Sequence, residues 1–178
     1  MTIIALVDDE PNILKALQRV LMKELWEIRT YSNPIEALED RDIHSVDLVL
    51  SDYRMPEMNG VEFLSEFRKL NPTAIRLILS GQADMTGLLT AINQAEVYRF
   101  ITKPWDNEEL VITLKQALEV NFLRQENERL AQTVRKQSQQ LRSQLSELKR
   151  LEKESPGITQ VDWNDDGSIS LNMDDYAD

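Results

Sequence analysis

The chain has no cysteine, and this absence excludes several kinds of chemistry. It forms no disulfide, no thiolate metal site and no cysteine nucleophile, and it suits a reducing compartment. The sequence also lacks any run near the roughly 20 apolar residues that a membrane-spanning helix needs. Its first residues show no basic lead-in of the kind that opens a secretion signal. We therefore expect a cytoplasmic protein that does not enter a membrane.

Basic charge is scarce, because 20 Lys and Arg residues stand against 31 Asp and Glu for a net charge of -11. Residues 1–105 carry 11 basic and 16 acidic side chains, residues 106–154 carry nine of each, and residues 155–178 carry six acidic and no basic ones. No segment has the basic excess typical of a DNA-binding module, so no direct contact with nucleic acid is expected. With 178 residues, 42% of them hydrophobic, the chain can bury one domain-sized core and still leave an appendage.

Short apolar runs alternate with amphipathic segments along the first 105 residues. Five runs are typical of buried strands: residues 3–7, 27–31, 48–50, 74–79 and 97–101. Helices are expected between them: one that opens at Pro11 and carries apolar positions as far as Leu25, one from Pro34, one over 61–70 and one over 84–95. This alternation predicts βαβ units. Residues 1–120 should form a doubly wound α/β domain around a five-stranded parallel sheet.

Polar residues stand where the predicted strands end. Asp8 and Asp9 follow the first strand, Asp52 the third, Ser80 the fourth and Lys103 the fifth. In open parallel sheets, ligands bind outside the carboxyl ends of the strands. Three carboxylates there would repel one another unless a cation shared the site, and oxygen ligands at an open position suit Mg²⁺. With a lysine and a hydroxyl as donors, the set predicts a site that holds a phosphoryl group on an aspartate, Asp52 being the nucleophile.

Each of these residues has an ordinary structural interpretation when taken alone. Two aspartates before a helix are usually a cap favoured by the helix dipole. Asp52 could be a turn residue, Ser80 another cap and Lys103 a solvated surface charge, while Phe100 fits a core position. Independent structural roles would not place all the charged and hydroxyl groups at one edge of one sheet, so their convergence favours the site.

At these residues the chain resembles the receiver domain of two-component response regulators, over about 120 residues. The matching features are the Asp8-Asp9 pair, Asp52 followed by Met55-Pro56, Asn59-Gly60, Ser80-Gly81, and Lys103-Pro104 with Phe100 three positions before the lysine. The resemblance implies a flavodoxin-like sheet of strand order 2-1-3-4-5. It also implies that Asp52 is phosphorylated by a partner histidine kinase, or by small acyl phosphates, and that Mg²⁺ is required.

The resemblance also implies roles for single residues. Asp9, Asp52 and the backbone carbonyl of Arg54 would ligate the metal, and Asp8 would act mainly through a metal-bound water. Lys103 would pair with the phosphoryl group.

Other positions that match the family would respond to phosphorylation or adjust it. Ser80 would turn toward the phosphoryl group and Phe100 would follow it inward. Arg54 and Gln82 stand where side chains tend to tune the lifetime of the phosphate. The Lys103-Pro104 bond matches a family site that often has a cis peptide.

A long helix should follow the sheet. Asp106-Asn107-Glu108-Glu109 is a strong helix start, and no proline or glycine follows until Pro156, so the helix could run for about 48 residues or about 70 Å. Its later part has a heptad seam: Leu123, Asn127, Leu130, Val134, Gln137, Leu141 and Leu148, with Leu145 and Leu151 suggesting a shift of phase. We expect a parallel coiled-coil homodimer over residues 121–154. The alternative is a single helix packed on a missing partner.

Residues 155–178 form an acidic tail. Alternation from Ile158 to Leu171 around Asn164-Asp165-Asp166-Gly167 resembles a β-hairpin, which is marginal alone and could stay disordered. Asp162, Asn164, Asp166 and Gly167 also fit half of a calcium loop, but Met173 stands where its glutamate should be.

The preferred function is a phosphoacceptor switch, not an enzyme, with slow self-dephosphorylation and an output through protein contacts with an unidentified target. One alternative is that the chain is the N-terminal part of a larger regulator with an omitted enzymatic module. Another is a phosphatase that uses the same Asp and Mg²⁺. The cognate kinase is not predicted.

Overall fold

The computed structural model describes residues 2–81 and 95–155. By its internal contacts the chain divides into two compact units, residues 1–126 and residues 127–178. The predicted helix over 84–95, except for its last residue, and the predicted hairpin or calcium loop after residue 155 lie outside the described residues, as does Gln82.

The first unit is built on a five-stranded sheet, whose strands are β1 (Thr2–Val7), β2 (Trp26–Tyr31), β3 (Leu48–Asp52), β4 (Ile75–Gly81) and β5 (Arg99–Lys103). Every neighbouring pair is parallel, and the strand order is β2-β1-β3-β4-β5. This confirms the predicted flavodoxin-like fold class. Because all strands run the same way, their carboxyl ends meet at one edge.

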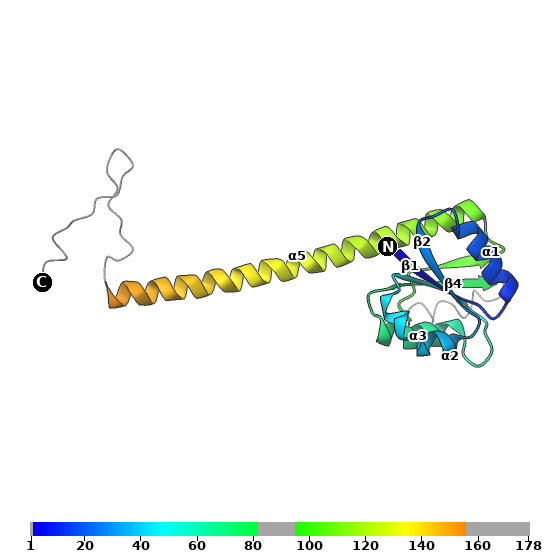
Figure 1. Cartoon of the computed structure of the whole chain (residues 1–178), viewed down its shortest axis with the longest axis horizontal. Coiled ribbons are helices and arrows are strands. Elements are labelled where there is room, and N and C mark those ends of the chain that lie inside the picture. The colour runs from blue at the N-terminus through cyan, green and yellow to red at the C-terminus, as the bar shows by residue number, and fades with distance from the viewer. Residues whose placement is uncertain (1, 82–94, 156–178) are drawn as a thin grey trace, which may run out of the picture. The chain divides into compact units, whose positions relative to one another are not determined.

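Helices cover both faces of the sheet (Figure 1). On one face lie α1 (Pro11–Leu21) and the first part of α5 (Asn107–Glu154); on the other lie α2 (Pro34–Glu39), the short 3-10 helix η1 (Arg41–Ser45) and α3 (Gly60–Leu70). Strand residues alternate between the two layers, so that Ala5 faces α3 while Leu6 faces α1. The central strands are therefore buried on both sides.

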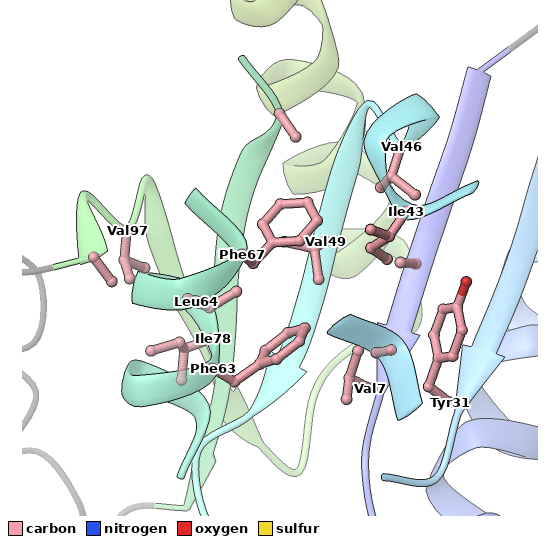
Figure 2. Close-up of a cluster of buried hydrophobic side chains, with 14 of the residues drawn as sticks. Val7, Tyr31, Ile43, Val46, Val49, Phe63, Leu64, Phe67, Ile78 and Val97 are labelled. Atoms are coloured by element: carbon pink, nitrogen blue, oxygen red, sulfur yellow. The ribbon is translucent and has the colours of Figure 1, made fainter. Parts of the chain in front are cut away.

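The face under α2 and α3 packs around two phenylalanines of α3 (Figure 2). Phe63 and Phe67 are fully buried, one helical turn apart, with ring centroids 6.1 Å from each other. They contact a layer that includes Val49 of β3 and Ile78 of β4. Burying each ring stabilises the fold by about 2 to 3 kcal/mol.

The buried hydrophobic residues of the face under α1 and α5 are all aliphatic. Leu14 and Leu17 of α1 and Leu110 and Leu114 of α5, spaced three or four residues apart, lie over Leu50 and other strand residues. The first turns of α5 therefore pack on the sheet.

Helix starts follow their capping residues. The Asn33 and Asn59 side chains accept hydrogen bonds from the first turns of α2 and α3, and Asn59 forms a reciprocal capping box with Glu62. Asp106 Oδ1 accepts from the N–H groups of Glu108 and Glu109 at the start of α5. Local side chains therefore decide where these helices begin.

Strands β3, β4 and β5 each run two residues past their predicted ends, and two further predicted boundaries were wrong. Helix α1 ends at Leu21 and Leu25 is 95% exposed, because the chain must leave the helix in time to pair Trp26 with Thr2 of β1. Strand β5 begins at Arg99, two residues late, since Val97 packs into the core after Glu96 takes a left-handed conformation (φ 47°). The helix η1 was not anticipated.

Helix α5 runs from Asn107 to Glu154, as its start and the lack of breakers predicted. In residues 127–154 its seam residues, among them Leu130, Val134 and Leu141, are about half exposed. Among the described residues, no helix combines the length and apolar content that crossing a membrane requires.

Candidate functional site

Three charged side chains meet at the carboxyl edge of the sheet. Asp8 follows β1, Asp52 ends β3 and Lys103 ends β5. The Lys103 Nζ lies 2.9 Å from Asp8 Oδ2 and 2.6 Å from Asp52 Oδ1. Residues far apart in the sequence are thus joined through one ammonium group.

Asp8 is held at the start of the loop between β1 and α1. It is 1% exposed, its backbone N–H donates to the Tyr31 carbonyl, and its Oδ1 accepts from the Glu10 N–H at 2.8 Å. Burial raises the pKa of the Asp8 carboxyl above its ordinary value, and the hydrogen bond from Lys103 opposes that rise. The ionised form therefore depends on a neighbouring cation.

Asp52 is the last residue of β3 and is 7% exposed. Its Oδ2 accepts from the Arg54 N–H at 2.8 Å, while Oδ1 faces Lys103. The buried Ser51 hydroxyl donates to the Asp52 backbone carbonyl at 2.9 Å. One carboxylate oxygen is thus fixed by the following loop, and the other points to the cationic side of the site.

Gly60 closes that loop against Asp52. Its N–H donates to the Tyr53 carbonyl at 2.9 Å, and a Cβ at Gly60 would overlap the backbone carbonyl oxygen of Asp52. From the sequence, Asn59-Gly60 was used only as a feature that matches the family, and this close approach was not predicted. The signal available was a glycine directly after a helix cap, eight residues beyond the candidate nucleophile.

Lys103 is largely covered, with a side chain 20% exposed. Burial lowers the pKa of its ammonium, but the hydrogen bonds that the ammonium donates to Asp52 and Asp8 outweigh burial and leave the pKa above its ordinary value. The Lys103–Pro104 bond is cis, as the resemblance implies. Two carboxylates and one ammonium leave the cluster one negative charge in excess.

The structure brings together only part of the predicted metal-binding set. Asp9 is half-buried, and its carboxylate makes no hydrogen bond or ion pair with another described residue. Across residues 2–81 and 95–155, no three acidic, histidine or cysteine side chains gather closely enough to hold a metal ion.

The convergent residues nevertheless fit a divalent cation. Asp8 and Asp52 converge on a positive group, offer hard oxygen ligands and carry excess negative charge.

Ser80 lies on β4, the strand next to β3, and Phe100 lies on β5, the strand beyond β4. Ser80 is 1% exposed and its hydroxyl donates to the Gly81 carbonyl at 3.1 Å. Phe100 pairs in register with Ile78 and packs partly buried against the α3 side of the core. The Arg54 side chain is exposed.

Comparison with known proteins gives relatives of one kind. The family model for the response regulator receiver domain matches residues 4–115. The hydrogenase transcriptional regulatory protein HoxA of Bradyrhizobium diazoefficiens is 38% identical over 125 residues, which is 70% of this chain and 26% of HoxA. The chain thus spans about a quarter of that relative's length.

The chain is also similar to solved structures. An uncharacterized protein from Neptuniibacter caesariensis is 40% identical with a TM-score of 0.67, covering 71% of this chain and 93% of that one. The signal receiver domain of an HD domain-containing protein from Pseudomonas fluorescens Pf-5 is 34% identical with a TM-score of 0.66. This match covers 70% of the present chain and 92% of the Pseudomonas chain.

Proposed function

Because the chain belongs to the family of response regulator receiver domains, we propose that its Asp52 carboxylate accepts a phosphoryl group from the phosphohistidine of a sensor histidine kinase. Receiver domains are phosphoacceptor switches rather than catalytic enzymes. The observation that carries the proposal is the bridge from Lys103 to both Asp52 and Asp8. The lack of cysteine supports a reducing compartment, and we place the transfer in the cytoplasm.

The geometry suits transfer to one oxygen of Asp52. Oδ2 is held by the Arg54 N–H, so Oδ1 is the nucleophile, and it lies beside the Lys103 ammonium. A phosphorus–oxygen bond forms at Oδ1 as the phosphorus–nitrogen bond of the donor breaks, and the electron pair stays on the imidazole. Lys103 then moves its hydrogen bond to a phosphoryl oxygen, because charge gathers there.

Mg²⁺, when bound, neutralises the phosphoryl oxygens. We propose that Asp9, Asp52 and the Arg54 carbonyl hold it and that Asp8 acts through a water. The excess negative charge around Lys103 supports a cation in this place.

Ser80 and Phe100 are the proposed readers of the phosphate. The Ser80 hydroxyl can exchange the Gly81 carbonyl for a phosphoryl oxygen, and Phe100, two strands from Asp52, can move into the space that this leaves. The side chains of Arg54 and Gln82 are proposed to tune the phosphate lifetime.

Intact mass after treatment with acetyl phosphate and Mg²⁺ tests the proposal. We expect a gain of one phosphoryl group, lost in Asp52→Asn and retained in Asp47→Asn. Asp47 is a matched control because its carboxylate accepts from the Ile3 N–H at the opposite end of β3. Equal labelling of the Asp52→Asn variant would remove Asp52 as the acceptor.

For the output, we propose a receiver over residues 1–120, a coiled-coil homodimer over 121–154 and a tail over 155–178. The half-exposed seam leucines of residues 127–154 support dimer formation. Changing Leu141 to Asp should weaken dimerisation in sedimentation equilibrium without affecting phosphorylation of Asp52. An unchanged dimer affinity in this variant would contradict the proposal that the seam residues form the dimer interface.

The length of the relatives supports a second candidate. HoxA is named a transcriptional regulatory protein, and the chain spans about a quarter of it. The chain could therefore be the regulatory part of a larger protein with a separate output domain. The mass of the native protein distinguishes this candidate from a stand-alone switch whose target is another protein.

A further inference from the structure

Residues 127–154 of α5 separate their charges by face. Relative to the seam, the basic side chains fall on the outer side of the helix: Arg129, Arg135, Lys136, Arg142, Lys149, Arg150 and Lys153. Among the acidic side chains only Glu128 shares that side, while Glu147, Glu152 and Glu154 flank the seam. The balanced count for residues 106–154 conceals this separation.

Four of these residues make up what we term the basic face: Arg135, Lys136, Arg142 and Lys149. All four are exposed, and none forms an ion pair with another described residue. No acidic residue occurs between positions 129 and 146, so Arg135, Lys136 and Arg142 lack the acidic partners that usually lie three or four positions away in a helix. Lys149, by contrast, has Glu152 three positions away. The helix therefore leaves most of this charge uncompensated.

The complementary charge follows in the same chain. Residues 155–178 contain six aspartates and no lysine or arginine. An external polyanion such as DNA would meet a chain of net charge -11, whereas a tethered segment has a local concentration on the order of millimolar. We propose that the aspartates of residues 162–178 bind the basic face of α5, in the same or the paired chain.

Chain length permits this contact. From Ser155 back to Arg142 the helix measures about 20 Å, and back to Arg135 about 30 Å, at 1.5 Å per residue. An extended chain covers about 24 Å between Ser155 and Asp162, and more than 60 Å by Asp174. The first aspartates thus reach Lys149 and Arg142, and the last reach Arg135 and Lys136. Single exposed ion pairs are weak, so the contact needs several at once and is sensitive to salt.

A spin label on the helix tests the proposal in the full chain. Since the chain has no cysteine, Gln139→Cys gives one labelling position between Lys136 and Arg142. At low salt we expect the amide NMR signals of residues 162–178 to lose most of their intensity through paramagnetic relaxation. They should recover at about 1 M salt, where the Debye length is about 3 Å.

Charge reversal provides the specific test. Arg135→Glu, Lys136→Glu and Arg142→Glu together should remove the broadening, and adding Asp162→Lys, Asp165→Lys and Asp166→Lys should restore it. The matched control reverses three exposed lysines of the first unit, Lys15, Lys23 and Lys69, for the same change in net charge. Helix content by circular dichroism checks folding, because glutamate is as good a helix former as arginine or lysine.

Three results would overturn the proposal. The first is sharp tail signals at low salt in the otherwise unchanged chain. The second is broadening that survives the triple reversal. The third is a short DNA duplex that binds the basic face while the tail stays sharp, which would assign this face to nucleic acid.

Discussion

Charged side chains occur in two contrasting settings in this chain. At the carboxyl edge of the sheet, Lys103 is largely covered and joins two buried carboxylates. In residues 127–154 of α5 the charged side chains are largely exposed to solvent, and Arg135 and Arg142 form no ion pair with a described residue. Buried charges interact strongly but depend on each other, whereas exposed charges act weakly and in number. A site for covalent chemistry needs the first setting, and a reversible, salt-sensitive contact needs the second.

Removing the buried cation should have the largest effect. In Lys103→Met, Asp8 and Asp52 lose their shared partner, and we expect the free energy of unfolding at neutral pH to fall by about 3 kcal/mol. Urea denaturation measures the loss. Lys69→Met is the matched control, because Lys69 is 68% exposed and, within residues 2–81 and 95–155, pairs only with Glu66 on its own helix. Equal losses of unfolding free energy in the two variants would show that burial does not make the ion pairs of Lys103 stronger than the exposed pair of Lys69.

The pH dependence of this variant follows from Asp8. Burial raises the pKa of Asp8 above 3.8 in the folded state, so the ionised carboxylate lowers stability at neutral pH. That cost is relieved as the pH falls through the raised pKa toward 3.8. The loss in Lys103→Met should therefore shrink in mild acid, and Asp8→Asn should recover part of it at neutral pH.

Crowding the backbone behind Asp52 should have the next largest effect. The Cβ of Gly60→Ala would overlap the Asp52 carbonyl oxygen, and moving that backbone costs about 1 to 3 kcal/mol. The same shift should slow phosphorylation of Asp52 by acetyl phosphate. Ser65→Ala, farther along α3, removes only a hydrogen bond to the Val61 carbonyl and serves as the control. A Gly60→Ala variant with unchanged stability would show that the loop can relax at little cost.

Much of the fold could be predicted because its signals are local. Asn33, Asn59 and Asp106 mark helix starts through hydrogen bonds within one turn. The late start of β5 and the burial of Arg76 could not be predicted, because both depend on tertiary packing: Val97 packs into the core, and Arg76 contacts the Ala95 carbonyl. Arg76 is 4% exposed within an apolar strand, and its guanidinium donates to the Ala74 and Ala95 carbonyls.

The site was predictable to the level of the sheet edge. Parallel strands bring their carboxyl ends together, so Asp8, Asp52 and Lys103 had to be near neighbours. The side-chain rotamer of Asp52 decides which of its oxygens faces Lys103. The closure of the loop decides that Gly60 approaches the Asp52 backbone closely. Neither the rotamer nor the loop closure has a periodic signal in the sequence.

Tyr31 and Asp40 pair a buried side chain with a half-buried one, and this pair lies between the two settings. The hydroxyl of buried Tyr31 donates to Asp40 Oδ2 at 2.6 Å, and burial together with this bond raises the Tyr31 pKa to about 12. The neutral phenol therefore contributes stability that is fully present below pH 10 and is lost as the pH rises toward 12. The tyrosinate absorbance that Tyr31→Phe removes should titrate in that window, and Asp40→Asn should shift it down toward pH 10. A window unaffected by Asp40→Asn would assign the shift to burial alone.

The smallest effect should come from an exposed pair with nearly the same geometry as the buried one. Arg150 lies 2.7 Å from Glu147, almost as close as Lys103 lies to Asp52, but the two side chains are 61% and 55% exposed. Water screens the attraction, so Arg150→Gln should change the free energy of unfolding by at most about 0.5 kcal/mol, and less in high salt. Urea denaturation beside Lys103→Met gives the comparison directly. Since the two distances are matched, a loss in Arg150→Gln as large as that in Lys103→Met would mean that contact distance, and not burial, sets the strength of these charges.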